Sequence, residues 1–157
     1  VSDAAKLLNS TLEALGTLHS EMDALASQLP EYETVMNLYG VGKVLCSQLI
    51  AEIGDVTRLK SNKSLTALAG IDPPPNQSGK DDPKSRRISK RGSPALRRTL
   101  FLIMTIYLQH QPADEPVYQF LDKKRAEGKP YKVYMIAAAH KFLRIYYARV
   151  KEVMPKE

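Results

Sequence analysis

One short stretch of the sequence carries enough positive charge to bind phosphate groups. Residues 80–99 contain 8 basic and 2 acidic side chains, whereas residues 1–79 contain 5 basic and 9 acidic ones. Such a field attracts a polyanion, and nucleic acid is the commonest polyanion in a cytosol; a solvated basic face is the alternative. Arginine makes bidentate phosphate contacts, and lysine acts as a mobile point charge. The side chains expected to contact nucleic acid here are Lys80, Arg86, Arg87, Lys90 and Arg91.

Ser78 and Gly79 stand at the start of this basic stretch. A serine that attacks a phosphodiester needs an accessible backbone, positive charge around the crowded phosphorus, and an acceptor for its proton. Gly79 gives the access and the neighbouring cations give the charge, so Gly79 is also expected to approach nucleic acid. No general base is obvious, because the three histidines lie in other predicted helices. On the local pattern alone, the simpler interpretation of Ser78 is a loop hydroxyl that caps a turn.

Three more serines follow in the same stretch, at Ser85, Ser89 and Ser93. Ser89 precedes two cations, which favours a phosphate contact. Ser93 precedes Pro94, and this order predicts a helix N-cap followed by proline in the first turn.

Arg97 and Arg98 lie at the start of the helix predicted over residues 94–110. The helix dipole disfavours cations in the first turn, so a DNA or RNA phosphate would explain this pair. The alternative is that both point to solvent or pair with acidic residues such as Asp114 or Glu115.

A Gly-Val-Gly turn joins a short predicted helix to a longer one within residues 31–54. Gly40 and Gly42 can adopt positive φ and allow close approach of another backbone, while Val41 can fill the space between the helices. The pattern resembles a helix-hairpin-helix motif, whose amides and second-helix N-terminus hold a DNA phosphate without reading sequence. Lys43 would add a cation there. An ordinary tight turn is the alternative.

Apolar residues in the first 29 positions alternate spacings of three and four, which predicts a long helix with a narrow heptad seam. Pro30 is expected to end it. The seam indicates either a coiled coil that makes a homo-oligomer through residues 1–29 or an antiparallel hairpin within the chain. The seam positions are Val1, Ala4, Leu8, Thr11, Leu15, Leu18, Met22, Leu25 and Leu29.

The other segments are also predicted to be helical, and strand signals are weak, so the expected fold class is all-α. Residues 1–30 form the coiled-coil helix and residues 31–157 a helical domain, with a long basic loop at about 71–93. The single cysteine, Cys46, fits a reducing cytosol and a core position rather than a nucleophile. No apolar run approaches the roughly 18 residues that a membrane span needs, and the sequence shows no signal-peptide pattern. We therefore expect a cytoplasmic, nucleoid-associated bacterial protein.

The order of these motifs resembles the C-terminal domain of bacterial transposases of the insertion sequence 110/116/902 family, over roughly residues 35–150. Each motif is weak alone, but together and in order they are specific. The matching motifs are Leu38-Tyr39-Gly40-Val41-Gly42, Ala51-Glu52-Ile53-Gly54-Asp55, Leu68-Ala69-Gly70-Ile71-Asp72-Pro73, Gln77-Ser78-Gly79-Lys80, Arg87-Ile88-Ser89-Lys90-Arg91-Gly92, Leu96-Arg97-Arg98 and Lys132-Val133 with His140-Lys141-Phe142-Leu143-Arg144.

The resemblance implies a DNA recombinase whose active site has two halves. One is an N-terminal resolvase-like domain with four acidic residues that bind a divalent metal such as Mg²⁺; the other is a serine in the present domain, here Ser78, that attacks DNA. It also implies a structured guide RNA and assembly of several protomers. Because the sequence begins at Val1 rather than Met, we expect it to be part of a longer protein and to be inert alone, with no metal or cofactor of its own.

Two other functions fit the residues without a reactive serine. A non-catalytic, dimeric helix-hairpin-helix module would explain the glycines, the cations and the heptads. An interaction protein would use the heptads as a scaffold and the basic stretch to bind acidic proteins or lipid. Trapping a covalent protein–DNA adduct would distinguish the recombinase from the helix-hairpin-helix module and from the interaction protein.

Overall fold

The computed structural model describes residues 2–73 and 87–155, and these residues form helices and connecting segments without a strand. This confirms the all-α fold class. The helices are α1 (Ser2–Ala26), α2 (Tyr32–Met36), α3 (Lys43–Ile53), the 3₁₀ turn η1 (Val56–Arg58), α4 (Asn62–Leu68), α5 (Pro94–His110), α6 (Pro116–Ala126) and α7 (Tyr131–Val153).

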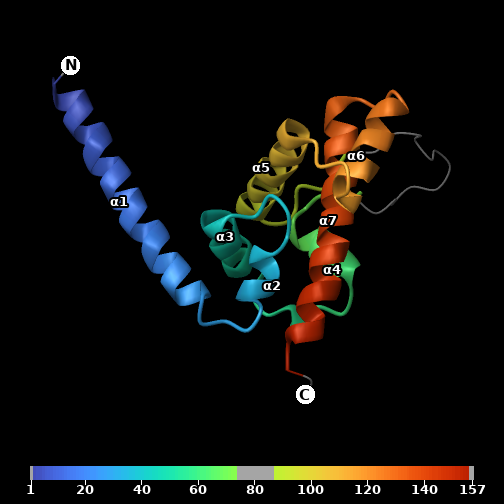
Figure 1. The fold of residues 1–157 in the computed structure, drawn as a ribbon, viewed down its shortest axis with the longest axis horizontal. Coiled ribbons are helices and arrows are strands. Elements are labelled where there is room, and N and C mark those ends of the chain that lie inside the picture. The colour runs from blue at the N-terminus through green and yellow to red at the C-terminus, as the bar shows by residue number, and fades with distance from the viewer. Residues whose placement is uncertain (1, 74–86, 156–157) are drawn as a thin grey trace.

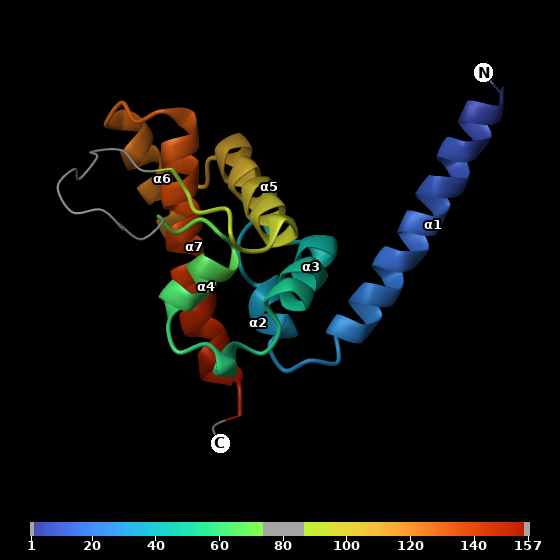
Figure 2. The same cartoon turned by 180° about the vertical axis from the view of Figure 1, so that it is seen from behind.

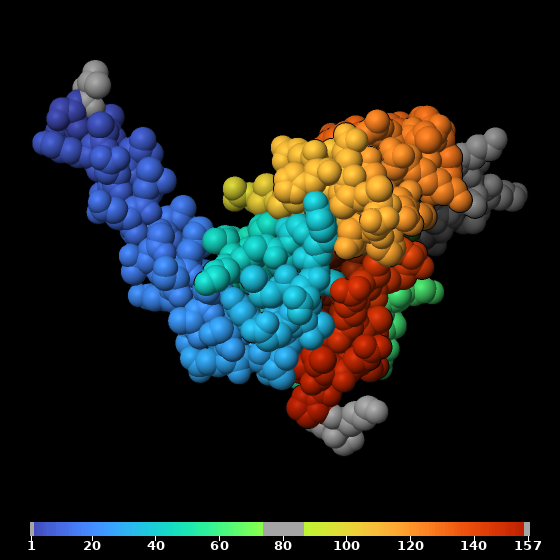
Figure 3. All heavy atoms as spheres, viewed as in Figure 1, coloured from blue at the N-terminus to red at the C-terminus, as the bar shows by residue number. Residues whose placement is uncertain are grey.

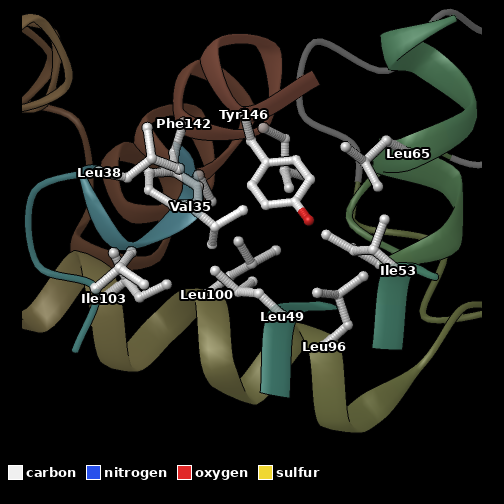
Figure 4. Close-up of a cluster of buried hydrophobic side chains, with 14 of the residues drawn as sticks. Val35, Leu38, Leu49, Ile53, Leu65, Leu96, Leu100, Ile103, Phe142 and Tyr146 are labelled. Carbon is white, nitrogen blue, oxygen red and sulfur yellow. The ribbon is translucent and has the colours of Figure 1, made fainter. Parts of the chain in front are cut away.

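Helix α7 is the element around which the domain packs. It contacts α2, α4, α5, α6 and η1, while α3 packs on α5 and α2 (Figures 1 and 2). One face of α7 is apolar at spacings of three and four, with Met135, Ala139, Phe142 and Tyr146 all buried, as an amphipathic core helix requires. Figure 4 shows Phe142 and Tyr146 meeting side chains that come from α2, α3, α4 and α5.

Helix α5 begins and ends where local chemistry dictates. The Ser93 hydroxyl accepts a hydrogen bond from the Leu96 amide at 3.1 Å, and Pro94 occupies the first turn, which confirms the predicted cap. The helix ends at Gln111, which adopts the left-handed conformation with φ 48°. The cap at Ser93 therefore fixes the position of the residues that precede α5.

Helix α1 extends away from the rest of the molecule. Its N-terminal end lies far from the other helices, and its C-terminal end meets α3 (Figures 1 and 3). The helix ends at Ala26, a few residues before Pro30. Most of its leucines are exposed, including Leu8 at 59%, Leu12 at 56% and Leu18 at 55%. The predicted long helix is therefore confirmed, and its seam faces solvent over most of its length.

Several predicted site residues lie outside the described residues. They are Ser78, Gly79, Lys80 and Arg86. In the part of the chain that the structure does describe, no helix is long and apolar enough to cross a membrane.

Candidate functional site

Two segments on either side of residues 73–88 lie against each other, and we call them the neck: residues 68–72 and 89–93. Three backbone hydrogen bonds join them, at 2.7, 3.0 and 2.7 Å. The neck therefore holds both ends of the intervening chain at one place on the domain. The three bonds run from the Ser89 amide to the Asp72 carbonyl, from the Lys90 amide to the Gly70 carbonyl, and from the Ser93 amide to the Leu68 carbonyl.

Two glycines, Gly70 and Gly92, allow the two segments of the neck to approach so closely. A Cβ on Gly92 would lie 2.1 Å from the Leu68 carbonyl oxygen and 2.4 Å from the Gly70 amide nitrogen. Gly70 itself adopts φ 63° and would place a Cβ 2.6 Å from the Gly92 nitrogen. Because the obstructing atoms are backbone atoms, no side chain can be accommodated at either position without moving the neck.

Side chains add further hydrogen bonds to the neck. The Ser89 hydroxyl donates to Asp72 Oδ1 at 2.6 Å. His140 Nε2 lies 3.0 Å from the Ile71 carbonyl oxygen; since that oxygen can only accept, Nε2 donates. These bonds connect the neck to itself and to the middle of α7.

The neck is also joined to α3 and α5. Arg97 Nη1 donates to the Ala69 carbonyl at 2.9 Å. The Ser93 hydroxyl donates to Glu52 Oε2 at 2.6 Å while it caps α5. Four helices thus take part in positioning the neck, counting α4, which leads directly into it.

The predicted phosphate-binding cations divide into two groups. Arg87, Lys90, Arg91 and Arg98 are exposed, and Lys90 adopts φ 55°, a left-handed conformation unusual for lysine. Arg97 is half-buried and has one guanidinium nitrogen engaged by the Ala69 carbonyl. Among the described residues neither Arg97 nor Arg98 forms an ion pair, so the alternative pairing with Asp114 or Glu115 does not occur.

The Gly-Val-Gly turn lies between α2 and α3. Gly40 has φ 77° and packs against Ile103 and Ile106 of α5, and Val41 is buried. Gly42 is the extended N-cap residue of α3, where no side chain caps the helix. Lys43 lies 3.8 Å from Asp23 Oδ2 of α1, yet its side chain is 74% exposed. A helix N-terminus that no side chain caps, with an exposed lysine beside it, is suited to an anion.

Two further titratable side chains, those of Cys46 and His110, have structural roles. Burial, followed by the nearby carboxylates of Asp23 and Glu31, raises the pKa of Cys46 from 9.0 to about 12, so this thiol is a core residue. His110 Nδ1 lies 3.1 Å from the Tyr39 hydroxyl. Within the described ranges, no three His, Cys, Asp or Glu side chains gather as a metal site requires.

Three residues that hold the neck, Glu52, Asp72 and His140, were part of the sequence motifs but were assigned no role there. Their partners lie 41, 17 and 69 positions away in the chain. Only Asp72 had a local signal, because it follows a predicted helix end and precedes proline.

Comparisons with known proteins show the family to which the chain belongs. A family model described as the transposase IS116/IS110/IS902 family matches residues 32–119, more than half of the chain. The chain therefore belongs to this family of transposases, and the resemblance drawn from the motifs is confirmed. The match begins at α2 and includes the Gly-Val-Gly turn and both halves of the neck.

Individual relatives come from three bacterial genera. The chain is 32% identical over 117 residues to a pilin gene-inverting protein of Moraxella bovis, covering 74% of this chain and 35% of that protein. It is 30% identical over 105 residues to the transposase for insertion sequence element IS1111A of Coxiella burnetii, covering 67% and 28%. It is 26% identical over 121 residues to an uncharacterized 42 kDa protein of insertion element IS900 of Mycobacterium paratuberculosis, covering 76% and 29%. The chain spans about a third of the length of these relatives.

Proposed function

We propose that this chain is the C-terminal part of a transposase, where it holds nucleic acid and supplies the Ser78 hydroxyl for DNA strand transfer in the movement of an insertion sequence. The observation that carries this proposal is the neck. It lies inside the region matched to the transposase family, and its two halves flank the part of the sequence that contains Ser78, Lys80, Arg86 and Arg87.

The neck makes such a segment usable for chemistry. Because Asp72 and Ser89 are hydrogen-bonded to each other through both backbone and side chain, the described residues on either side of the Ser78 segment are held at one place. Fixing the ends removes much of the entropic cost of presenting a reactive group. Exposed Arg87, Lys90 and Arg91 adjoin that place and supply positive charge for a phosphodiester.

The reaction needs few parts from this chain. The Ser78 oxygen attacks phosphorus and displaces a sugar oxygen, while the cations offset the charge that develops on the phosphoryl oxygens. The serine proton and the leaving oxygen need an acid–base partner, which we assign to the acidic domain expected outside this sequence. That domain would also hold the divalent metal, since the described residues offer no ligand cluster for one.

The turn before α3 gives a second contact with nucleic acid. The α3 N-terminus and Lys43 would hold one backbone phosphate and contribute no sequence preference. The same basic surfaces would serve the structured guide RNA. The exposed leucines of α1 support assembly of protomers through residues 1–29, because a row of solvent-facing leucines on one helix gains by pairing with another copy.

The nucleophile is tested in the full-length protein that contains this chain. Ser78→Ala should abolish recombination and the covalent protein–DNA adduct while leaving DNA affinity nearly unchanged. Ser85→Ala, in the same segment, is the matched control and should recombine normally. Recombination at the wild-type rate by Ser78→Ala would show that another group attacks the DNA. A protein that binds DNA but never forms an adduct would instead be the non-catalytic helix-hairpin-helix module.

Assembly through α1 is tested on the 157-residue chain itself. Light scattering after size-exclusion chromatography should give a mass above that of one 17.6 kDa chain, and Leu8→Ser with Leu12→Ser should return it to the monomer. A monomeric wild-type chain at high concentration would remove the oligomer from the proposal.

A further inference from the structure

A cavity of about 400 Å³ is lined by residues of α4, α6 and α7, and its lining residue His140 is hydrogen-bonded to Ile71 of the neck. Helix α4 contributes Asn62, Lys63 and Thr66 to its lining. Its volume falls in the range of small-molecule pockets. Neither the phosphate contacts proposed above nor the family match assigns a role to it.

Helix α7 contributes the opposite wall. Ala137, His140 and Arg144 follow one another at spacings of three and four, so they lie on one face of the helix. Ala137 is small and leaves room between the polar groups. The cavity is thus formed by the polar faces of two helices whose other faces pack into the core.

The charge of the cavity has one sign. Lys63, His140 and Arg144 are its titratable residues, and among the described residues that line it none is acidic. No ion pair joins Lys63 or Arg144 to an acid in the described part of the chain. Two permanent cations facing one cavity repel each other, and a bound anion relieves that repulsion.

An aromatic ring completes the lining. Phe120 of α6 is partly exposed and lies in the cavity wall; Lys124, which is itself paired with Glu127, lies 5.7 Å from the ring centroid. An exposed aromatic face beside phosphate-binding cations is the combination that binds an unpaired nucleotide, because the ring stacks on a base and the cations hold the backbone. Asn62 and Thr66 add hydrogen-bonding groups for the base or sugar.

We propose that this cavity binds one unpaired nucleotide of a single strand, with its phosphate between Lys63 and Arg144 and its base on Phe120. The proposal rests on the proposed function, because it assumes that the chain handles nucleic acid. His140 links the site to the neck, because it lines the cavity and its Nε2 is engaged by the Ile71 carbonyl. A nucleotide in the cavity would therefore lie beside a side chain that is hydrogen-bonded to the neck.

The test uses the 157-residue chain and a fluorescein-labelled (dT)12 strand, with a 20-base-pair duplex as comparison. Lys63→Gln with Arg144→Gln should weaken (dT)12 binding about 10-fold and reduce the salt slope by about 0.7, the contribution of the one single-strand phosphate that the two cations would hold. Lys132→Gln with Arg149→Gln removes two exposed charges from α7 outside the cavity and is the matched control, with a loss of less than 3-fold. Phe120→Leu should weaken (dT)12 binding about 5-fold or more and leave binding of inorganic phosphate unchanged.

A second measurement needs no variant. Adding dAMP to the ¹⁵N-labelled chain should shift the amide resonances of Thr66, Ala137 and His140, with smaller shifts elsewhere. Equal losses in the two double variants, or shifts that avoid these amides, would overturn the cavity proposal even if DNA binds. If dAMP shifts them but (dT)12 does not bind, the site takes free nucleotides and the strand is the wrong source. A wild-type chain that binds neither strand nor duplex would sink the proposed function, whatever dAMP does.

Discussion

Among the described glycines, Gly92 is the one whose replacement by alanine should destabilise the neck most. The new Cβ would lie 2.1 Å from the Leu68 carbonyl oxygen, and real Cβ contacts do not fall below 3.0 Å. The two segments therefore have to separate by about 0.9 Å. Leu68 and Gly70 cannot yield by rotating a side chain, because the atoms in contact belong to the backbone.

The cost follows from two terms. Overpacking of this kind costs about 1–3 kcal/mol. Separation also stretches the bonds from the Ser93 amide and the Lys90 amide, which now measure 2.7 and 3.0 Å. A typical hydrogen bond contributes about 1 kcal/mol, so the two weakened bonds together should lose about 1 kcal/mol. We expect the free energy of unfolding to fall by about 2–4 kcal/mol. At about 2–4 °C per kcal/mol for a chain of this size, Tm should fall by about 4–16 °C.

Thermal unfolding followed by circular dichroism measures this change, and amide hydrogen exchange at Lys90 and Ser93 locates it. Gly16→Ala is the matched control, because nothing lies within 4 Å of a Cβ there and alanine is favoured over glycine inside a helix by up to about 1 kcal/mol. Its Tm should be unchanged or higher. If Gly92→Ala melts within 2 °C of the wild-type chain, the close backbone contact on which the neck depends does not exist.

Three further changes test the surroundings of the neck. Ser93→Ala removes the N-cap of α5 and should lower the unfolding free energy in urea by about 1 kcal/mol, while Ser93→Thr should retain most of it. Arg97→Gln loses the charged hydrogen bond to the Ala69 carbonyl and should cost about 1 kcal/mol or more, whereas Arg98→Gln on the exposed side should change stability by less than about 0.5 kcal/mol; equal effects would contradict the assignment. Because the pKa of Cys46 is raised from 9.0 to about 12, the folded state holds that proton more tightly, so stability should fall between pH 9 and 12 and fall less steeply in Cys46→Ala. Parallel pH profiles would rule this out.

Local sequence signals gave the right helices where the determining atoms are neighbours in the chain. The serine–proline pair predicted the start of α5 because a cap needs only the hydroxyl and an amide three residues later. The Gly-Val-Gly spacing likewise predicted the boundary between α2 and α3, and apolar periodicity predicted α7. These features depend on contacts within a few residues.

The candidate site was less accessible to the same reasoning. The pattern around Ser89 predicted a phosphate contact, and its hydroxyl bonds to Asp72, 17 residues away. Arg97 was predicted on charge alone, and half-burial brings it to the Ala69 carbonyl. Charge patterns show that a side chain needs a partner, but only the packing of α4 and α5 against α7 determines which partner it meets. The roles of Ser78 and of the exposed cations remain predictions of the motif.

Because Asp72 and Ser89 are hydrogen-bonded to each other, the sequence between them and the sequence of the core are constrained differently. A change in the segment between them alters what is presented to a ligand, whereas the core packed around Phe142 and Tyr146 keeps its contacts (Figure 4). Even doubling the length of a closed segment costs only about 0.6 kcal/mol. A lineage carrying this domain can therefore diversify its reactive segment with little penalty to folding, provided that Gly70 and Gly92 are retained.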